Sequence, residues 1–138
     1  MNNYAILEEK YKHLFEQDKH GSILRGIKCG TGWYNHVEKF LESLEWIRTH
    51  NLHLNNNDSE EFHYISIFQI KEKFGECRCY VSHVSSIDNQ VSEAVGSLTG
   101  KCSITCEKCG KLEYDCIKSN GYWIYCLCSK CYSERWKQ

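Results

Sequence analysis

Four cysteines in the last third of the chain have the spacing of metal ligands. They form two Cys-x-x-Cys pairs, Cys106/Cys109 and Cys128/Cys131, with 18 residues between the pairs. In each pair a tight turn points two thiolates at one place, while neighbouring backbone N–H groups face the sulfurs. Four sulfur ligands suit the tetrahedral preference of zinc and leave no open position for catalysis. The spacing therefore predicts one structural zinc ion.

The residues between the two pairs are expected to bring them together. Gly110 follows the first pair and can adopt the positive φ that such a turn often requires. The residues on either side of Ser119-Asn120-Gly121 predict two short strands, and hence a zinc-ribbon-like module over residues 101–138. This module is expected to pack on the rest of the chain as one unit.

Three further cysteines of this region have no assigned role. Cys126 lies two residues before Cys128, so it is the first alternative as a metal ligand, and otherwise a packed thiol. A second metal held by Cys102, Cys116 and a histidine is a further alternative, although no known spacing favours it.

Composition limits the class of protein. The 138 residues are 41% apolar and 25% charged, as in a soluble globular domain. No apolar run reaches the roughly 18–20 residues that cross a bilayer, and the N-terminal residues are too charged for a signal peptide. We therefore expect a cytoplasmic protein, in which ten cysteines indicate metal binding better than disulfides.

Hydrophobic periodicity predicts an α+β fold in which helices pack on a small antiparallel sheet. The predicted core domain covers residues 1–100 and is followed by the zinc module. Its turns are marked by the glycines between residues 21 and 32 and by a polar loop at residues 55–58. The predicted elements are helices over residues 3–18, 33–50 and 87–99 and a hairpin over residues 62–84.

The predicted hairpin carries a cluster of cations, and residues 69–80 are called the lysine hairpin below. Lys71 and Lys73 are two apart on a strand and project from one face, and Arg78 on the partner strand can join them. Such a cluster suits a phosphate or a carboxylate. The alternative is a solvated hairpin end whose charge Glu72 and Glu76 neutralise.

A second candidate is the Gly-rich segment, residues 26–34. Trp33 and Tyr34 follow its glycines and begin a helix, where backbone N–H groups favour an anion. Aromatic rings beside cations are what a nucleotide or a short single strand needs. The alternative is that Trp33, like Trp46 and Trp123, anchors the core. Cys29 has no partner base that would identify it as a nucleophile.

The order of these motifs resembles a family of small, largely uncharacterised phage and bacterial proteins. Its members carry a GI-CG-GW segment, a KEKFG-LR-Y hairpin and a terminal pair of zinc-binding turns. The resemblance covers about residues 24–131 and implies the same element order and the same zinc ligands. It implies no established activity. The chain departs from the pattern at Glu76-Cys77, where Gly-Leu is expected, at Cys79, where an aromatic is expected, and at Thr31, where an acidic residue is frequent.

Three classes of function follow from these features. The first is a non-enzymatic binder of a nucleotide or nucleic acid, which in a phage protein extends to sequestering a host immune nucleotide signal. The second is an adaptor or inhibitor whose zinc module binds a host protein through Tyr122, Trp123, Tyr125 and Trp136. An enzyme is less expected, because no catalytic constellation is visible, among the seven histidines or elsewhere. The binder would use Trp33, Tyr34, Lys71, Lys73, Arg78 and Tyr80.

The charge of the chain is uneven and gives the binder modest support. Residues 1–100 carry 10 Lys/Arg against 14 Asp/Glu, whereas residues 101–138 carry 7 against 4. The positive balance of the zinc module favours an anionic partner, although such a balance is also common on inert surfaces.

Overall fold

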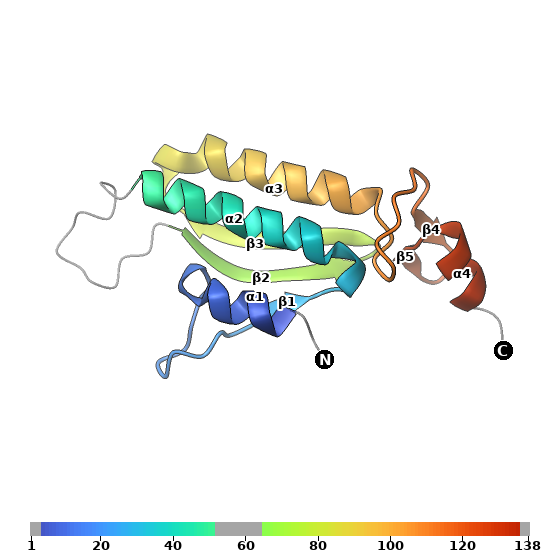
Figure 1. The fold of residues 1–138 in the computed structure, drawn as a ribbon, viewed down its shortest axis with the longest axis horizontal. Helices are drawn as coiled ribbons and strands as arrows, with labels where there is room; N and C mark the ends of the chain where they lie inside the picture. Colours follow the sequence, from blue (N-terminus) through green and yellow to red (C-terminus); the bar gives the residue numbers. More distant parts are fainter. Residues whose placement is uncertain (1–3, 52–64, 136–138) are drawn as a thin grey trace.

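The computed structural model describes residues 4–51 and 65–135. Figure 1 shows two long helices side by side along a sheet, with the cysteine-rich end of the chain packed beyond one end of that sheet. The α-helices are α1 (Tyr4–Lys10), α2 (Tyr34–His50), α3 (Asp88–Ser103) and α4 (Ser129–Arg135). Short 3-10 turns are η1 (Lys12–Leu14), η2 (Thr31–Trp33) and η4 (Ser85–Ile87).

The described strands form two sheets. The larger has the order β1 (Gly26–Lys28), β2 (Ile65–Lys73), β3 (Glu76–His83), and the smaller pairs β4 (Ile117–Ser119) with β5 (Ile124–Cys126). β2 and β3 are antiparallel, as predicted, but β1 runs parallel to β2. The expectation of an antiparallel sheet is therefore right for β2 and β3 and wrong for β1. A three-residue strand that begins at a glycine has too little periodicity to be recognised in the sequence.

Helices cover only one face of the larger sheet. The inward-facing residues include Ile27, Ile70 and Cys77, which are at most 3% exposed, and they share one core with α1, α2 and α3. The edge of β1 is closed by α1, because the Glu8 carboxylate accepts a 2.9 Å hydrogen bond from the backbone N–H of Ile27. The opposite face carries no described element and is called the open face below.

The predicted helix over residues 3–18 is shorter in the structure. α1 ends at Lys10, and η1 turns the chain so that Phe15 adopts an extended conformation and bridges to Ile67. Both helix types bring residues three apart to similar sides, so the buried Tyr11 and Leu14 fit a 3-10 turn as well as an α-helix. The periodicity therefore predicts correctly which of these side chains are buried, but it places the C-terminal end of the helix too late in the chain.

The other helices follow the sequence more closely. α2 covers the predicted span of residues 33–50, with η2 immediately before it. α3 begins near the predicted residue 87 but continues past residue 99 to Ser103, so it crosses the expected boundary at residue 101 and carries Cys102 in its last turn. Residues 62–64 of the predicted hairpin and the polar loop at residues 55–58 lie outside the described residues.

No helix within residues 4–51 and 65–135 combines the length and the apolar character that a bilayer crossing requires.

Candidate functional site

The four cysteines predicted as ligands meet at one point. The Sγ atoms of Cys106, Cys109, Cys128 and Cys131 all lie within 4.8 Å of one another. Cys109 is exposed and the other three are buried. Within the described residues this is the one cluster that could hold a metal ion. The chemistry of the donor set, four thiol sulfurs, fits a closed structural site.

The first pair lies in a tight turn closed by backbone hydrogen bonds. The N–H of Gly110 donates to the carbonyl of Cys106 at 2.9 Å, and the N–H of Cys106 donates to the carbonyl of Lys111 at 2.8 Å. Gly110 has φ +85, as the sequence predicted. Burial acts to raise the pKa of Cys106, but hydrogen bonds from the backbone at residues 128, 109 and 108 outweigh burial and hold it at about 7. The turn thus favours the thiolate that a metal needs.

The second pair lies at the beginning of a helix rather than in a second isolated turn. Cys128 directly precedes α4 and Cys131 is in its first turn, where the N–H of Cys131 faces the sulfur of Cys128 at 3.5 Å. This helix was not predicted, and a zinc ribbon is not confirmed, although the β4–β5 hairpin lies where it was expected. Residues 104–135 are called the C-terminal module below.

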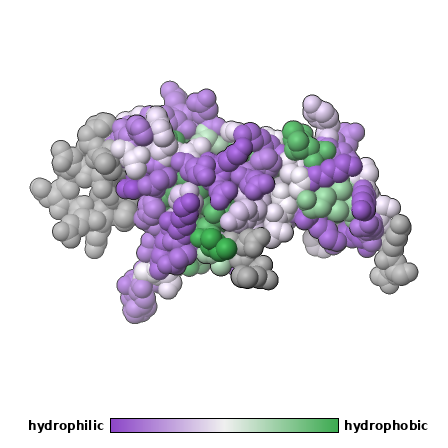
Figure 2. Space-filling view, in the orientation of Figure 1, coloured by the Kyte–Doolittle hydropathy of each residue, from purple (hydrophilic) through white to green (hydrophobic). Residues whose placement is uncertain are grey.

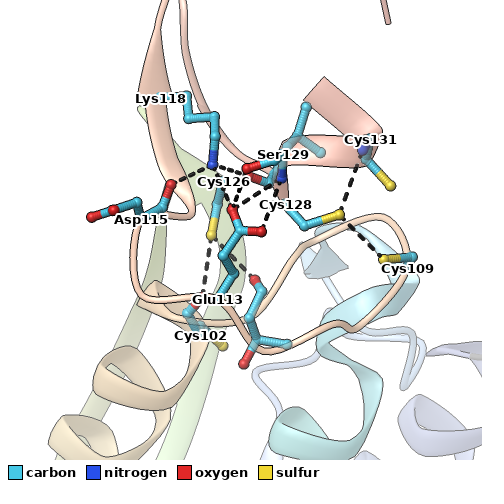
Figure 3. A network of polar contacts seen from close by, with 11 residues as sticks. Cys102, Cys109, Glu113, Asp115, Lys118, Cys126, Cys128, Ser129 and Cys131 are labelled. Atoms are coloured by element: carbon cyan, nitrogen blue, oxygen red, sulfur yellow. Dashed lines mark hydrogen bonds and ion pairs between the residues drawn. The ribbon is translucent and has the colours of Figure 1, made fainter. Parts of the chain in front are cut away.

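An acidic residue fixes the start of α4 (Figure 3). The carboxylate of Glu113 accepts hydrogen bonds from the N–H and hydroxyl of Ser129, each at 3.0 Å. It also pairs at 3.0 Å with the ammonium of Lys118, which donates further to the carbonyls of Asp115 and Leu127. This network ties the β4–β5 hairpin to the helix that carries Cys131, and so supports the second pair of ligands.

The remaining cysteines of this region are packed thiols. Cys102, Cys116 and Cys126 are fully buried, and the thiol of Cys126 donates to the carbonyls of Cys102 and Thr105, both at 3.2 Å. Burial raises the pKa of Cys126 to about 12. Among the described residues none of the three joins a metal cluster. The alternatives of Cys126 as a ligand and of a second metal therefore receive no support.

The Gly-rich segment contacts the turn of the first cysteine pair. The N–H of Gly32 donates to the carbonyl of Glu107 at 2.7 Å, and the N–H of Gly30 donates to the Glu107 carboxylate at 2.7 Å. A Cβ atom at Gly30 would lie 2.4 Å from the Glu107 carbonyl oxygen, and one at Gly32 would lie 2.2 Å from that of Cys106. Glycine is needed at both positions because two backbones meet there.

Trp33 is an anchor of this contact and not a stacking surface. It is 0% exposed, and its indole N–H donates to the carbonyl of Thr105 at 2.7 Å. A ligand has no access to its ring, so Trp33 cannot stack on a base in this structure. Tyr34 is half-buried with its ring 5.5 Å from that of Tyr4, on the helical side of the sheet.

Cys29, in the same segment, is held in its neutral form. Its thiol donates to the hydroxyl of Tyr4 at 3.5 Å, and burial raises the pKa of Cys29 to about 12. A thiol that stays protonated at neutral pH is a poor nucleophile. The environment of Cys29 is that of a packing residue.

The lysine hairpin, in contrast, displays its cations on the open face. Lys71 pairs in register with Arg78 on β3 and with Lys28 on β1. Residues in register on adjacent strands point to the same side, so Lys28, Lys71 and Arg78 form a row across the sheet. Lys73 lies two residues beyond Lys71 on the same face. None of these four side chains is buried.

Two aromatic rings lie next to this row. Tyr80 pairs with Gln69, which lies two residues before Lys71 on the same face of β2. Tyr80 is 43% exposed. The register between β2 and β3 shifts at Phe68, so this residue bulges outward; it is 38% exposed, with the guanidinium of Arg25 lying 5.5 Å from its ring centre. The open face thus combines cations with exposed aromatic surface.

Acidic neighbours neutralise this face only in part. Glu76 pairs with Arg78 at 2.8 Å, as the alternative interpretation of the hairpin required. Glu72 points to the other face, where its carboxylate accepts a 2.8 Å hydrogen bond from the N–H of Gly75. Among the described residues no carboxylate forms an ion pair with Lys28, Lys71 or Lys73, so the face keeps a positive excess.

Lys28 is the member of this row that the sequence did not identify. It lies more than 40 residues before Lys71, and only the parallel pairing of β1 with β2 brings the two together. The sequence offers only Ile27-Lys28 as a sign of this strand, and two residues are too few to show the alternation that predicts a strand.

A groove of about 660 Å³ lies elsewhere, between α2 and α3. Its floor includes Phe40 and Leu98, and its rim mixes Lys39 and Lys101 with acidic side chains such as Glu93. Mixed charge on the rim makes this groove a weaker site for an anion than the open face.

Comparison with protein-family models, with curated proteins and with solved structures gives no match to this chain.

Proposed function

We propose that this protein is a non-enzymatic, metal-stabilised binder of nucleotides or short single-stranded nucleic acid, which it holds on the open face of the sheet. The observation that supports this function best is the row Lys28–Lys71–Arg78 beside the exposed ring of Tyr80. Cations in a row can bind successive phosphate groups, and an aromatic ring can stack on any of the bases.

The spacing of the row suits a phosphate backbone. Adjacent strands are about 4.8 Å apart, so the three cationic side chains start from points that span roughly 10 Å. Arg78 offers a planar pair of donors to one phosphate, and the lysines add mobile point charges on either side of it. Tyr80 lies one row away, within reach of a base attached to the same backbone.

Zinc is the metal proposed for the four-cysteine cluster, because four thiolates match its preferred ligands and geometry. Cys106, Cys109, Cys128 and Cys131 would hold it and leave no position for a substrate. In this proposal the metal stabilises the C-terminal module, and the module in turn fixes the Gly-rich segment through Gly30, Gly32 and Trp33. The metal takes no part in binding the ligand.

The test is a binding titration at several salt concentrations, with a fluorescent 12-nucleotide oligothymidylate and with a mononucleotide. The double substitution Lys28→Ala/Lys71→Ala should weaken binding about tenfold or more and reduce the slope of log K against log salt by about 1.4, since each single-strand phosphate contact contributes about 0.7. The unfolding midpoint should stay nearly unchanged.

The matched control removes the same charge from the other side of the molecule. Lys39 and Lys101 lie on the rim of the helical groove, so Lys39→Ala/Lys101→Ala should leave affinity nearly intact. Equal losses of affinity in the two double variants would mean that only the net charge of the protein matters, and not the position of the lysines. Absence of binding by the unmodified protein to both ligands at low salt would rule out the proposed function.

A protein-binding adaptor is the second candidate. Tyr122 and Trp123, at the tip of the β4–β5 hairpin, are 91% and 65% exposed, as an interface would require. Figure 2 shows hydrophobic surface on this module surrounded by hydrophilic residues. Tyr125, predicted to share this role, is half-buried with Arg135 lying 4.4 Å from its ring centre. Trp136 lies outside the described residues.

A further inference from the structure

The lysine hairpin and the β4–β5 hairpin of the C-terminal module touch at one end of the larger sheet (Figure 1). A Cβ atom at Gly75 would lie 3.0 Å from Cγ2 of Ile124 and 3.2 Å from the carbonyl oxygen of Tyr125. The turn that carries Phe74 therefore adjoins the hairpin whose tip carries Tyr122 and Trp123. The two hairpins are therefore in direct contact at this point.

Phe74 occupies a conformation that a phenylalanine does not favour. Its φ of 55 makes it the one non-glycine residue with positive φ among the described residues. Asn, Asp or Gly normally fills this position in a two-residue hairpin turn, because a bulky residue there is strained. The ring is 60% exposed, so burial does not compensate for this strain. The ammonium of Lys73 lies 5.8 Å from the ring centre, which places a cation beside exposed aromatic surface.

The tip of the β4–β5 hairpin presents its aromatic rings on a fixed backbone. The side-chain oxygen of Asn120 accepts hydrogen bonds from the N–H groups of Tyr122 at 2.9 Å and Trp123 at 2.8 Å. The N–H of Asn120 also donates to the carbonyl of Trp123 at 3.1 Å. A tip ordered in this way loses little conformational entropy when a ring stacks on a ligand.

The charge of the module favours an anionic occupant for this surface. Residues 104–135 carry 5 Lys/Arg against 4 Asp/Glu. Two of the four acids are engaged within the fold, Glu107 with the N–H of Gly30 and Glu113 with Lys118 and Ser129. Lys108, Lys111 and Lys130 are exposed, so the module as a whole keeps a positive excess. Aromatic rings among cations suit a single-stranded nucleic acid.

We propose that the binding strip runs from Tyr80 and Phe68 on the open face, past Phe74, to Trp123 and Tyr122 on the C-terminal module. This inference rests on the proposed function and narrows its ligand: the strip is made for a single strand of several nucleotides, not for a mononucleotide. The strip offers three stacking positions, which are Tyr80 with Phe68, then Phe74, then Trp123 with Tyr122. Filling all three requires at least three bases. A mononucleotide occupies one position and gains nothing from the module.

The experiment compares ligand lengths and variants. Affinity is measured for thymidylate DNA of 1, 2, 4, 8 and 12 nucleotides with the full-length, metal-loaded protein. The variants are Trp123→Ser and Phe74→Asn, the latter because asparagine accepts the left-handed conformation with little strain. The control is Tyr114→Ser, which removes a ring that is 90% exposed in the same module but outside the hairpin tip.

The expected result depends on ligand length. Affinity of the unmodified protein rises steeply between 2 and 8 nucleotides. Trp123→Ser and Phe74→Asn each weaken binding of the 8- and 12-nucleotide strands about tenfold, as loss of one base–aromatic stack does. Both leave the mononucleotide affinity unchanged, and Tyr114→Ser has little effect at any length. Metal content and the unfolding midpoint, measured on each variant, exclude loss of folding as the cause.

Failure of this inference can be told apart from failure of the proposed function. If long strands bind but Trp123→Ser and Phe74→Asn leave their affinity unchanged, the strip ends on the sheet and the inference is wrong while the proposed function stands. If no strand of any length binds, the proposed function fails together with the inference.

Discussion

The Gly-rich segment and the lysine hairpin carry similar side chains but have opposite surroundings. Both combine glycine, aromatic residues and lysine, and both were predicted to contact a ligand. In the structure the first lies beneath the turn of Cys106 and Cys109, where Trp33 is 0% exposed. The second has no described element over its outer face, and Tyr80 is 43% exposed.

The difference shows that two segments of similar composition can have opposite environments, one buried between segments of the chain and the other exposed. Glycines in the Gly-rich segment allow two backbones to approach, whereas Gly75 in the lysine hairpin allows a turn and a contact with β5. What separates the two is which surface the C-terminal module occupies. The following predictions test that contrast, starting with the largest expected effect.

Loss of one metal ligand should affect the covered segment first. Cys128→Ser should lower the metal content and unfold the C-terminal module, because structural zinc contributes several kcal/mol or more to folding. Trp33 would then lose its cover, which its fluorescence emission would report as a shift to longer wavelength. The control is Cys126→Ala, a buried thiol outside the cluster, which should keep the metal and lower the unfolding midpoint only modestly. Equal metal loss in the two variants would contradict the ligand assignment.

A methyl group between the two backbones should destabilise the protein without touching the open face. Gly32→Ala places a Cβ atom 2.2 Å from the carbonyl oxygen of Cys106, and such overpacking costs about 3 kcal/mol. Gly96→Ala is the matched control, because no atom lies within 4 Å of its Cβ; inside α3 it should stabilise by about 0.5–1 kcal/mol. Chemical denaturation measures both. If Gly32→Ala left the free energy of unfolding unchanged, the two backbones would not meet at this position.

Removal of a single hydrogen bond in the covered segment should have a smaller effect. Trp33→Phe leaves the buried carbonyl of Thr105 without its 2.7 Å donor, which costs about 1–3 kcal/mol. Ligand affinity should not change, since the ring has no exposed surface. Tyr80→Leu is the reverse case and should weaken ligand binding with little change in the free energy of unfolding. A Trp33→Phe variant that folds normally but loses affinity would reverse the roles assigned to the two segments.

Alkaline pH should destabilise the covered segment slightly. Burial holds the pKa of Cys29 at about 12 in the folded protein, against 9.0 for an unperturbed thiol. Above pH 9 the unfolded chain therefore loses a proton that the folded chain keeps, and the free energy of unfolding falls as pH rises toward 12. Cys29→Ala should reduce this slope between about pH 9 and pH 10.5. An unchanged slope would show that Cys29 is not buried as described.

Much of the architecture follows from the sequence because it depends on local patterns. The two Cys-x-x-Cys pairs identify the four-cysteine cluster, since the spacing within each pair alone places two thiols close together. The stripe of Val37, Phe40 and Leu44 predicts α2, and the β-branched and aromatic residues after residue 64 predict the lysine hairpin. These signals repeat over many residues, so neighbouring positions reinforce one another.

Tertiary structure alone decided which candidate residues face solvent. The parallel pairing of β1 placed Lys28 beside Lys71, although a strand of three residues that begins at a glycine has no period that predicts it. The position of the C-terminal module buried Trp33 and left Tyr80 exposed. An amphipathic pattern states that a side chain prefers a covered face, but exposure depends on contacts between segments far apart in the chain, which a local pattern does not contain.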